Sequence, residues 1–278
     1  MRIGGPIFEK YENSEEWVHL VKSKGCSAAY CPLSPDAQEN VVSEFKNAAE
    51  KANIVIAEVG AWSNPLSSDD KEKRHALEKC KKALYLAETI GARCCVNIAG
   101  SRGNKWDGPD EKNLTEETFE MIVETVREII DSVKPRETYY TLETMPWVYP
   151  DSADSYLDLI KAIDRKHFAV HFDPANLICS VRRYYFNGDL IKEFVGKLGK
   201  FICSCHAKDV IMSEKPMVCI EETRPGLGNL DYRTYLTQIN KLDRDVPLMM
   251  EHLHNENEYK LAADYIRSIA GEQKISFL

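Results

Sequence analysis

The chain has 278 residues, with 36 Lys and Arg against 44 Asp and Glu, a formal net charge of −8. Its mean hydropathy is −0.40, and it holds no run of about 18 apolar residues, so a transmembrane helix is excluded. The excess of acid argues against nucleic acid as the main partner, because phosphate binding requires a basic surface. The start of the chain lacks the apolar stretch of a signal peptide. We therefore expect a cytoplasmic protein without a membrane partner.

The nine cysteines have no spacing that indicates a function. Their number is odd and no CxxC pair occurs, so neither a disulfide framework nor a thiolate metal site is indicated. We interpret them as small buried thiols in a reducing compartment.

Strand-like and helix-like segments alternate along the whole chain. The strand-like runs are short and apolar: Arg2–Phe8, Cys26–Cys31, Ile54–Val59, Ala92–Ile98, Tyr139–Met145, Phe168–Phe172, Phe201–Cys205 and Pro247–Glu251. The segments between them have the 3.6-residue period of helices with one buried face. They cover Ser14–Lys24, Pro35–Ala52, Lys71–Ile90, Thr115–Val133, Ala153–Ile163, Asp189–Leu198, Asp231–Leu242 and Glu256–Ala270.

Eight strands and eight helices in strict alternation predict parallel strands with crossover helices. Eight repeats in a chain of this length match a closed (β/α)8 TIM barrel. An open doubly wound sheet would also alternate, but Gly4-Gly5-Pro6 after the first strand is not a dinucleotide-binding GxGxxG fingerprint. No linker or change in composition interrupts the pattern. We expect one α/β domain over residues 1–278.

Polar residues at the carboxyl ends of barrel strands are the natural candidates for function. The last four predicted strands bring Glu143, Asp173, His206 and Glu251 to the same rim. Three carboxylates at one barrel mouth repel one another unless a cation neutralises them. Three oxygen donors and one imidazole suit a divalent metal ion, with Mn²⁺ first and Mg²⁺, Co²⁺ or Zn²⁺ as alternatives.

At these residues the sequence resembles the xylose isomerase-like TIM barrels, also described as the sugar phosphate isomerase/epimerase family, which includes sugar 3-epimerases and AP endonucleases. The resemblance covers nearly the whole chain. It is carried by LETMPW (142–147), HFDPANL (171–177), HAKD (206–209), RPGLGNLDY (224–232) and MEHL (250–253). It implies that Glu143, Asp173, His206 and Glu251 hold one metal ion, and that Glu143 and Glu251 are also the proton-transferring pair.

The chain departs from this family at three points. The ketose epimerases often have a substrate-binding His where this chain has Asn176. The AP endonucleases have additional His and Asp ligands for three zinc ions, and this chain lacks that set. The xylose isomerases proper use a second metal site, for which only Asp209 is visible here. The resemblance therefore implies one metal ion and disfavours DNA repair.

Further rim residues are candidate substrate contacts. Trp62 and Trp147 follow the third and fifth strands, where they form either aromatic walls for a sugar or ordinary packing. His171 either lines the pocket or belongs to an inner layer of the barrel. Asn176, Lys208, Asp209 and Arg224 complete the predicted substrate contacts. His252 alternates away from Glu251, and we interpret it as structural.

Three functions remain open at this point. The favoured one is a metal-dependent sugar isomerase or epimerase that removes the proton next to a carbonyl and forms an enediolate. The first alternative is a metal-dependent lyase that cleaves 3-keto-glycosides, including C-glycosides, by β-elimination, and works with a small partner subunit. The second is a sugar-binding barrel without catalysis. The predicted partner is a small sugar substrate, and a homo-oligomer is compatible with the sequence.

Overall fold

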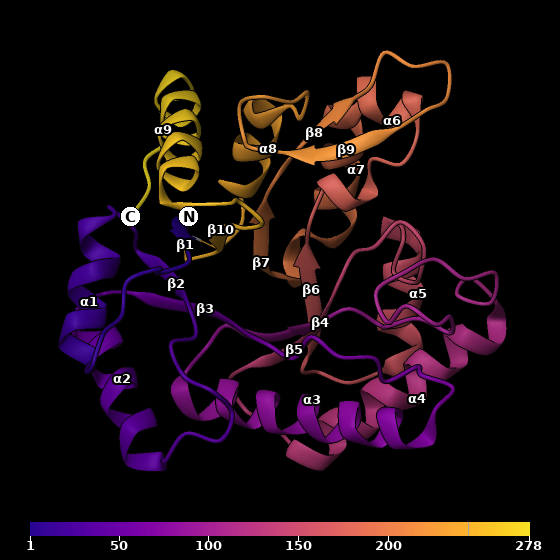
Figure 1. Cartoon of the computed structure of the whole chain (residues 1–278), viewed down its shortest axis with the longest axis horizontal. Coiled ribbons are helices and arrows are strands. Elements are labelled where there is room, and N and C mark those ends of the chain that lie inside the picture. Colours follow the sequence, from indigo (N-terminus) through magenta and orange to yellow (C-terminus); the bar gives the residue numbers. More distant parts are fainter. Residues whose placement is uncertain (244) are drawn as a thin grey trace.

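The computed structural model describes residues 1–243 and 245–278. Within them, eight parallel strands close into a barrel in the order β1-β10-β7-β6-β5-β4-β3-β2, as the alternation predicts (Figure 1). These strands are β1 Arg2–Gly5, β2 Ala28–Tyr30, β3 Val55–Gly60, β4 Cys94–Asn97, β5 Tyr139–Glu143, β6 Phe168–Phe172, β7 Ile202–Ala207 and β10 Pro247–Met250. The barrel closes where Ile3 of β1 pairs with Leu248 of β10.

The helices surround the barrel and bury one face each. They are α1 Ser14–Ser23, α2 Glu39–Lys51, α3 Asp70–Ile90, α4 Glu116–Val133, α5 Ala153–Ile163, α6 Val181–Tyr185, α7 Asn187–Leu198, α8 Tyr232–Ile239 and α9 Glu256–Glu272. Two short 3₁₀ helices, η1 Ala175–Leu177 and η2 Gly199–Phe201, complete the list. The boundaries of the α-helices follow from local chemistry. The Thr115 side chain caps the start of α4, and Gly91 ends α3 at a φ of 78°, which favours glycine.

A hairpin interrupts the strict alternation that the sequence predicts. β8 Asp209–Met212 and β9 Ile220–Thr223 form a separate antiparallel pair after β7, and the short helix α6 precedes α7 (Figure 1). The hairpin extends beyond the barrel mouth, so its strands are half exposed and lack the continuous apolar run of a barrel strand. This is why the periodicity of the sequence does not reveal it.

Two register shifts affect the strands that carry polar side chains into the barrel. The pairing of β2 with β3 shifts between Ala29 and Tyr30, so that Tyr30 lies opposite Glu58. The pairing of β6 with β7 shifts between Val170 and His171, so that His171 lies opposite Ser204. Such irregularities redirect side chains at the rims of barrels. Here they accompany a buried polar layer formed by Glu58, His171 and Ser204.

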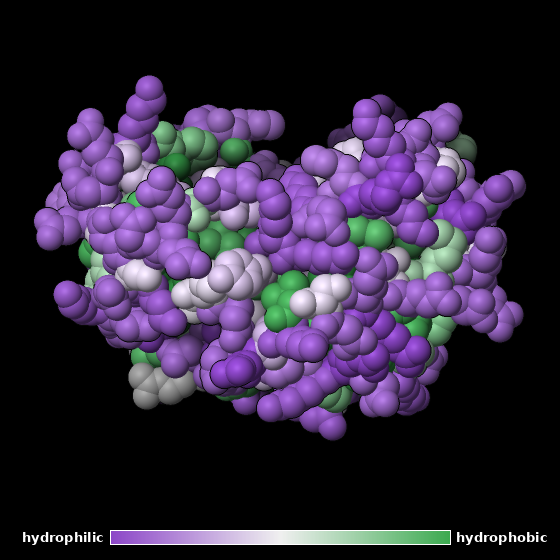
Figure 2. All heavy atoms as spheres, turned by 90° about the horizontal axis from the view of Figure 1, so that it is seen from below, coloured by the Kyte–Doolittle hydropathy of each residue, from purple (hydrophilic) through white to green (hydrophobic). Residues whose placement is uncertain are grey.

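The face of the molecule in Figure 2 is mostly hydrophilic, with small hydrophobic areas between polar side chains. No helix among the described residues is both long and apolar enough to cross a membrane. The nine cysteines are free thiols. Cys179 and Cys219 are exposed, so the expectation of buried thiols is wrong for these two.

Candidate metal centre

Four predicted ligands meet at the barrel mouth. Glu143 ends β5, His206 lies near the end of β7, and Asp173 and Glu251 directly follow β6 and β10. One side-chain donor atom from each lies within 4.8 Å of the other three. The carboxyl ends of parallel barrel strands share one rim, which is why residues so distant in sequence converge.

Lys208 supplies a positive charge to this cluster. Its Nζ lies 2.8 Å from Asp173 Oδ2, 2.5 Å from Glu251 Oε1 and 3.4 Å from Glu143 Oε1. Its side chain is only 3% exposed, so water screens these contacts weakly. One ammonium group does not balance three carboxylates.

Asp173 and Glu251 stay ionised despite their burial. Burial raises the pKa of Asp173, but Lys208 and His206 outweigh it and hold that pKa well below its usual range. Burial also raises the pKa of Glu251, but His206 and Lys208 outweigh it and lower that pKa to about 2. Burial lowers the pKa of Lys208, but the three carboxylates outweigh this effect and raise that pKa well above its usual value. The cluster therefore offers charged oxygen donors at neutral pH.

The Nδ1 atom of His206 faces the carboxylates. It lies 2.8 Å from Glu251 Oε1, 3.1 Å from Glu143 Oε1 and 3.7 Å from Asp173 Oδ2. Burial lowers the pKa of His206, but Glu251, Glu143 and Glu58 raise it well above its usual value. Without a metal ion, the ring therefore carries a proton at the position where an ion would bind.

This arrangement predicts that metal binding releases a proton. Because the pKa of His206 is raised, the ring is protonated at pH 7 and must lose the Nδ1 proton to become a ligand. We expect about one proton released per chain and an affinity that rises about tenfold per pH unit below that pKa. Calorimetry in buffers of different ionisation enthalpy measures the release. Binding without proton release would show that His206 is not a ligand.

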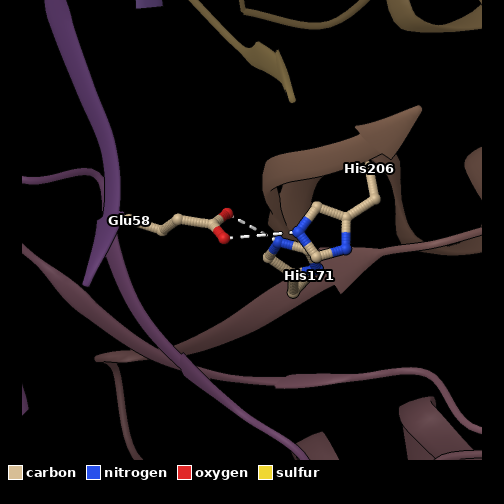
Figure 3. Close-up of side chains that lie close together, drawn as sticks. All are labelled: Glu58, His171 and His206. Atoms are coloured by element: carbon tan, nitrogen blue, oxygen red, sulfur yellow. Dashed lines mark hydrogen bonds and ion pairs between the residues drawn. The ribbon is translucent and has the colours of Figure 1, made fainter. Parts of the chain in front are cut away.

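Glu58 is a functional candidate that the sequence analysis missed. Its carboxylate comes from β3 and reaches the rings of His171 and His206 inside the barrel (Figure 3). Burial raises the pKa of Glu58, but the two histidines lower it more strongly, so it is ionised. An acidic residue within an otherwise apolar strand run is the one signal that could have revealed it.

A pocket of about 560 Å³ opens above the cluster. Of the predicted substrate contacts, Trp62, Asn176 and Lys208 line it. The sequence analysis did not predict the other lining residues as substrate contacts: Tyr30, Ile98, Trp106, Asp107, Met145, Glu222 and His252. The pocket thus combines aromatic surfaces with charged groups.

Asn176 is tied to a metal ligand. Its Nδ2 donates to Glu143 Oε1 at 2.9 Å, and its backbone N–H donates to Asp173 Oδ1 at 3.4 Å. The same residue therefore lines the pocket and orients Glu143.

His171 lies in the inner layer of the barrel, one of the two alternatives that its position left open. Its side chain has no exposed surface, and Nε2 donates to Glu58 Oε2 at 2.8 Å. A direct contact with a substrate in the pocket is not compatible with this burial, so the predicted substrate contact is corrected to a position beneath the metal ligands.

Trp147 and Arg224 are not among the residues that line this pocket. Trp147 is half buried and packs against the main core. The Nε of Arg224 pairs with Glu258 Oε2 of α9 at 2.8 Å, which ties the loop after β9 to that helix. Trp147 thus contributes to packing and Arg224 to an ion pair, and their predicted contacts with a substrate stay predictions.

Asp209 holds the loop after β9 instead of facing the pocket. Its Oδ2 accepts from the N–H groups of Gly226 and Gly228 at 3.0 and 3.1 Å, and its Oδ1 accepts from Leu230 at 2.8 Å. A Cβ on Gly228 would lie 2.3 Å from Asp209 Oδ1, so only glycine allows this approach. This placement corrects the predicted substrate contact.

Asp209→Ala is expected to destabilise the protein by about 3 kcal/mol, since three loop N–H groups lose a charged acceptor. Denaturant unfolding measures the loss, and hydrogen exchange at Gly226, Gly228 and Leu230 locates it. The exposed Asp36, which pairs with Lys82, provides the control Asp36→Ala, which should change stability little. Undiminished protection of the three amides would contradict the assignment.

His252 lines the pocket, contrary to its interpretation as structural. The chain has left the strand at Met250, and His252 has a φ of 58°, so the alternation of strand side chains does not extend to it. Its Nδ1 lies 3.0 Å from Glu222 Oε2, and its Nε2 lies 3.6 Å from Glu251 Oε2. It therefore connects the hairpin to Glu251, one of the predicted metal ligands.

A family model described as xylose isomerase-like TIM barrel matches residues 18–269, in agreement with the motifs at the strand ends. The chain belongs to this family. No curated protein matches this xylose isomerase-like chain in sequence.

Solved structures similar to this xylose isomerase-like barrel span almost its whole length. D-psicose 3-epimerase from Clostridium cellulolyticum, solved with D-tagatose, is 15% identical, has a TM-score of 0.67, and the match covers 97% of this chain and 99% of that one. For 3-keto-D-glucoside 4-epimerase from E. coli the identity is 14%, the TM-score 0.68 and the coverage 96% and 99%. Endonuclease IV from Thermus thermophilus is 13% identical and has a TM-score of 0.74, and the match covers 98% of this chain and 100% of that one. At these identities the likeness shows the fold alone.

Proposed function

We propose that this protein is a divalent-metal-dependent isomerase or epimerase of a sugar or keto-sugar. The observation that carries the proposal is the convergence of Glu143, Asp173, His206 and Glu251 within 4.8 Å beneath a pocket with aromatic walls. Sugar and keto-sugar epimerases are among the proteins of similar fold, which supports this substrate class.

The four side chains fit a divalent ion by charge and by donor type. Together with Lys208, such an ion balances the three carboxylates once His206 is neutral. Oxygen donors with one imidazole favour Mn²⁺, with Mg²⁺, Co²⁺ and Zn²⁺ as alternatives. When bound, the ion supplies a Lewis acid that polarises a carbonyl and stabilises the negative charge that follows proton removal.

Glu143 and Glu251 are the groups that we assign to proton transfer. They follow β5 and β10, which β6 and β7 separate in the barrel, so their carboxylates approach the pocket from different sides. Asn176 fixes the orientation of Glu143, and Lys208 donates toward both carboxylates. A pair of bases gives epimerisation, whereas one base that returns the proton to the neighbouring carbon gives isomerisation.

The second candidate function is a lyase that acts on 3-keto-glycosides. This lyase would begin with the same proton removal as the isomerase or epimerase, but the resulting carbanion would then expel a β-substituent. Asn176 favours it over a ketose epimerase, because the amide takes the place of the family's substrate-binding histidine and donates to Glu143. The nine free thiols agree with a cytoplasmic site of action for either enzyme.

Incubation of the Mn²⁺-loaded protein with ketoses and 3-keto-glycosides in deuterated water tests the proposal. We expect metal-dependent deuterium incorporation at the carbon next to the carbonyl, detected by mass spectrometry, together with an epimer or isomer. Release of the glycoside's leaving group would favour the lyase instead. Absence of both exchange and release across the panel would contradict the proposed proton transfer.

A further inference from the structure

A polar layer inside the barrel centres on Glu58, whose carboxylate faces the rings of His171 and His206 (Figure 3). Its Oε2 accepts from His171 Nε2 at 2.8 Å and from Ser204 Oγ at 3.0 Å. Its Oε1 lies 3.2 Å from His206 Nε2. The carboxylate is 2% exposed, and both imidazole rings are fully buried. This layer has no role in the proton transfer proposed above.

The geometry of this layer fixes where the ring protons lie. His171 Nε2, Ser204 Oγ and His206 Nε2 all lie within hydrogen-bond distance of the two oxygens of Glu58, and a carboxylate accepts from such donors. His171 Nδ1 is buried without a hydrogen-bond partner among the described residues, which places the His171 proton on Nε2 facing Glu58. The same carboxylate demands a proton on His206 Nε2.

We propose that Glu58 is a positioning residue that assigns His206 its metal-binding nitrogen. By holding the Nε2 proton, Glu58 leaves the Nδ1 lone pair for a metal ion shared with Glu143, Asp173 and Glu251. The inference rests on the metal site of the proposed function. Carboxylate groups that orient metal-binding imidazoles in this way typically improve metal affinity 10- to 100-fold.

The alternative is a second metal site formed by Glu58, His171 and His206, whose donor atoms also lie within 4.8 Å of one another. If both sites held an ion, His206 would bind through both nitrogens and would have to lose its last ring proton. The short contacts of Glu58 with both rings instead give each of its carboxylate oxygens a hydrogen-bond partner without a metal ion. We therefore favour positioning over a second site.

Glu58→Gln tests the assignment, because the amide keeps the shape but cannot accept from every donor of the layer. We expect Mn²⁺ affinity, measured by calorimetry, to fall about 10- to 100-fold with one ion bound per chain in both proteins. ¹⁵N NMR of the wild-type protein loaded with diamagnetic Mg²⁺ should show the His206 proton on Nε2. This second measurement needs no variant, so it holds even if Glu58→Gln folds poorly.

Two controls separate positioning from general stability. Ser204→Ala removes one donor but leaves both histidine contacts, and its affinity should stay within about threefold of wild type. Glu88→Gln alters a half-buried carboxylate that accepts from the N–H groups of residues 136–138, and it should lower stability without changing affinity.

Unchanged Mn²⁺ affinity in Glu58→Gln would overturn the inference while leaving the metal site intact. A proton on His206 Nδ1 in the Mg²⁺-loaded protein would overturn the inference and also exclude Nδ1 as a metal ligand. Two ions per wild-type chain, with one lost in Glu58→Gln, would favour the second metal site. Absence of Mn²⁺ binding to the wild-type protein would instead contradict the proposed function itself.

Discussion

Glu143→Gln and Glu251→Gln are each expected to lower turnover at least about 100-fold at saturating metal, the usual contribution of a general base. Glutamine keeps the shape and one oxygen donor but removes the basic charge. Metal affinity should also weaken, so turnover is compared only after the occupancy of each variant has been raised to saturation. In a two-base epimerase, one variant should still exchange the substrate hydrogen with deuterated water without inverting the centre.

Glu221→Gln is the matched control for this pair. Glu221 lies on β9, outside the pocket, and contacts Cys219 at the surface. Its replacement should leave turnover nearly unchanged. Near-normal turnover in both Glu143→Gln and Glu251→Gln would rule out the carboxylate pair. The remaining ionisable residues that line the pocket are Asp107, Lys208, Glu222 and His252.

Metal addition is expected to raise the free energy of unfolding by about 4 kcal/mol when the free ion exceeds its Kd 1,000-fold. The ion binds the native arrangement of ligands, and an unfolded chain lacks it. Asp173→Asn should remove most of this increase. Asp173 is fully buried, its Oδ1 accepts from the Ala175 N–H, and its Oδ2 faces Lys208 at 2.8 Å.

Asp158→Asn provides the control, since Asp158 is exposed on α5 and pairs only with Lys161 three residues on. It should respond to metal like the wild-type protein. Thermal unfolding with and without Mn²⁺, in chelator-treated samples, measures both variants. A full metal response in Asp173→Asn would show that the ion binds elsewhere.

The barrel and its rim were predictable because both depend on short-range patterns. Strand-like and helix-like segments alternate eight times along the sequence. Glu143, Asp173, His206 and Glu251 lie at or directly after the ends of four of these strands. Parallel strands place such residues at one rim whatever their sequence separation.

The residues beneath and beside this rim depend on local geometry that periodicity does not contain. Glu58 faces His171 where the register of β3 shifts, and His252 enters the pocket because a positive φ follows the end of β10. Asp209 is drawn away from the pocket by three loop N–H groups that the sequence does not place near it.

The position of a bound ion tests the account most directly. A crystal grown with Mn²⁺ and measured near the manganese absorption edge should show one anomalous peak per chain. We predict that this peak lies about 2.0–2.4 Å from carboxylate oxygens of Glu143, Asp173 and Glu251 and from Nδ1 of His206. A peak between Glu58, His171 and His206, or no peak within the barrel mouth, would contradict the account.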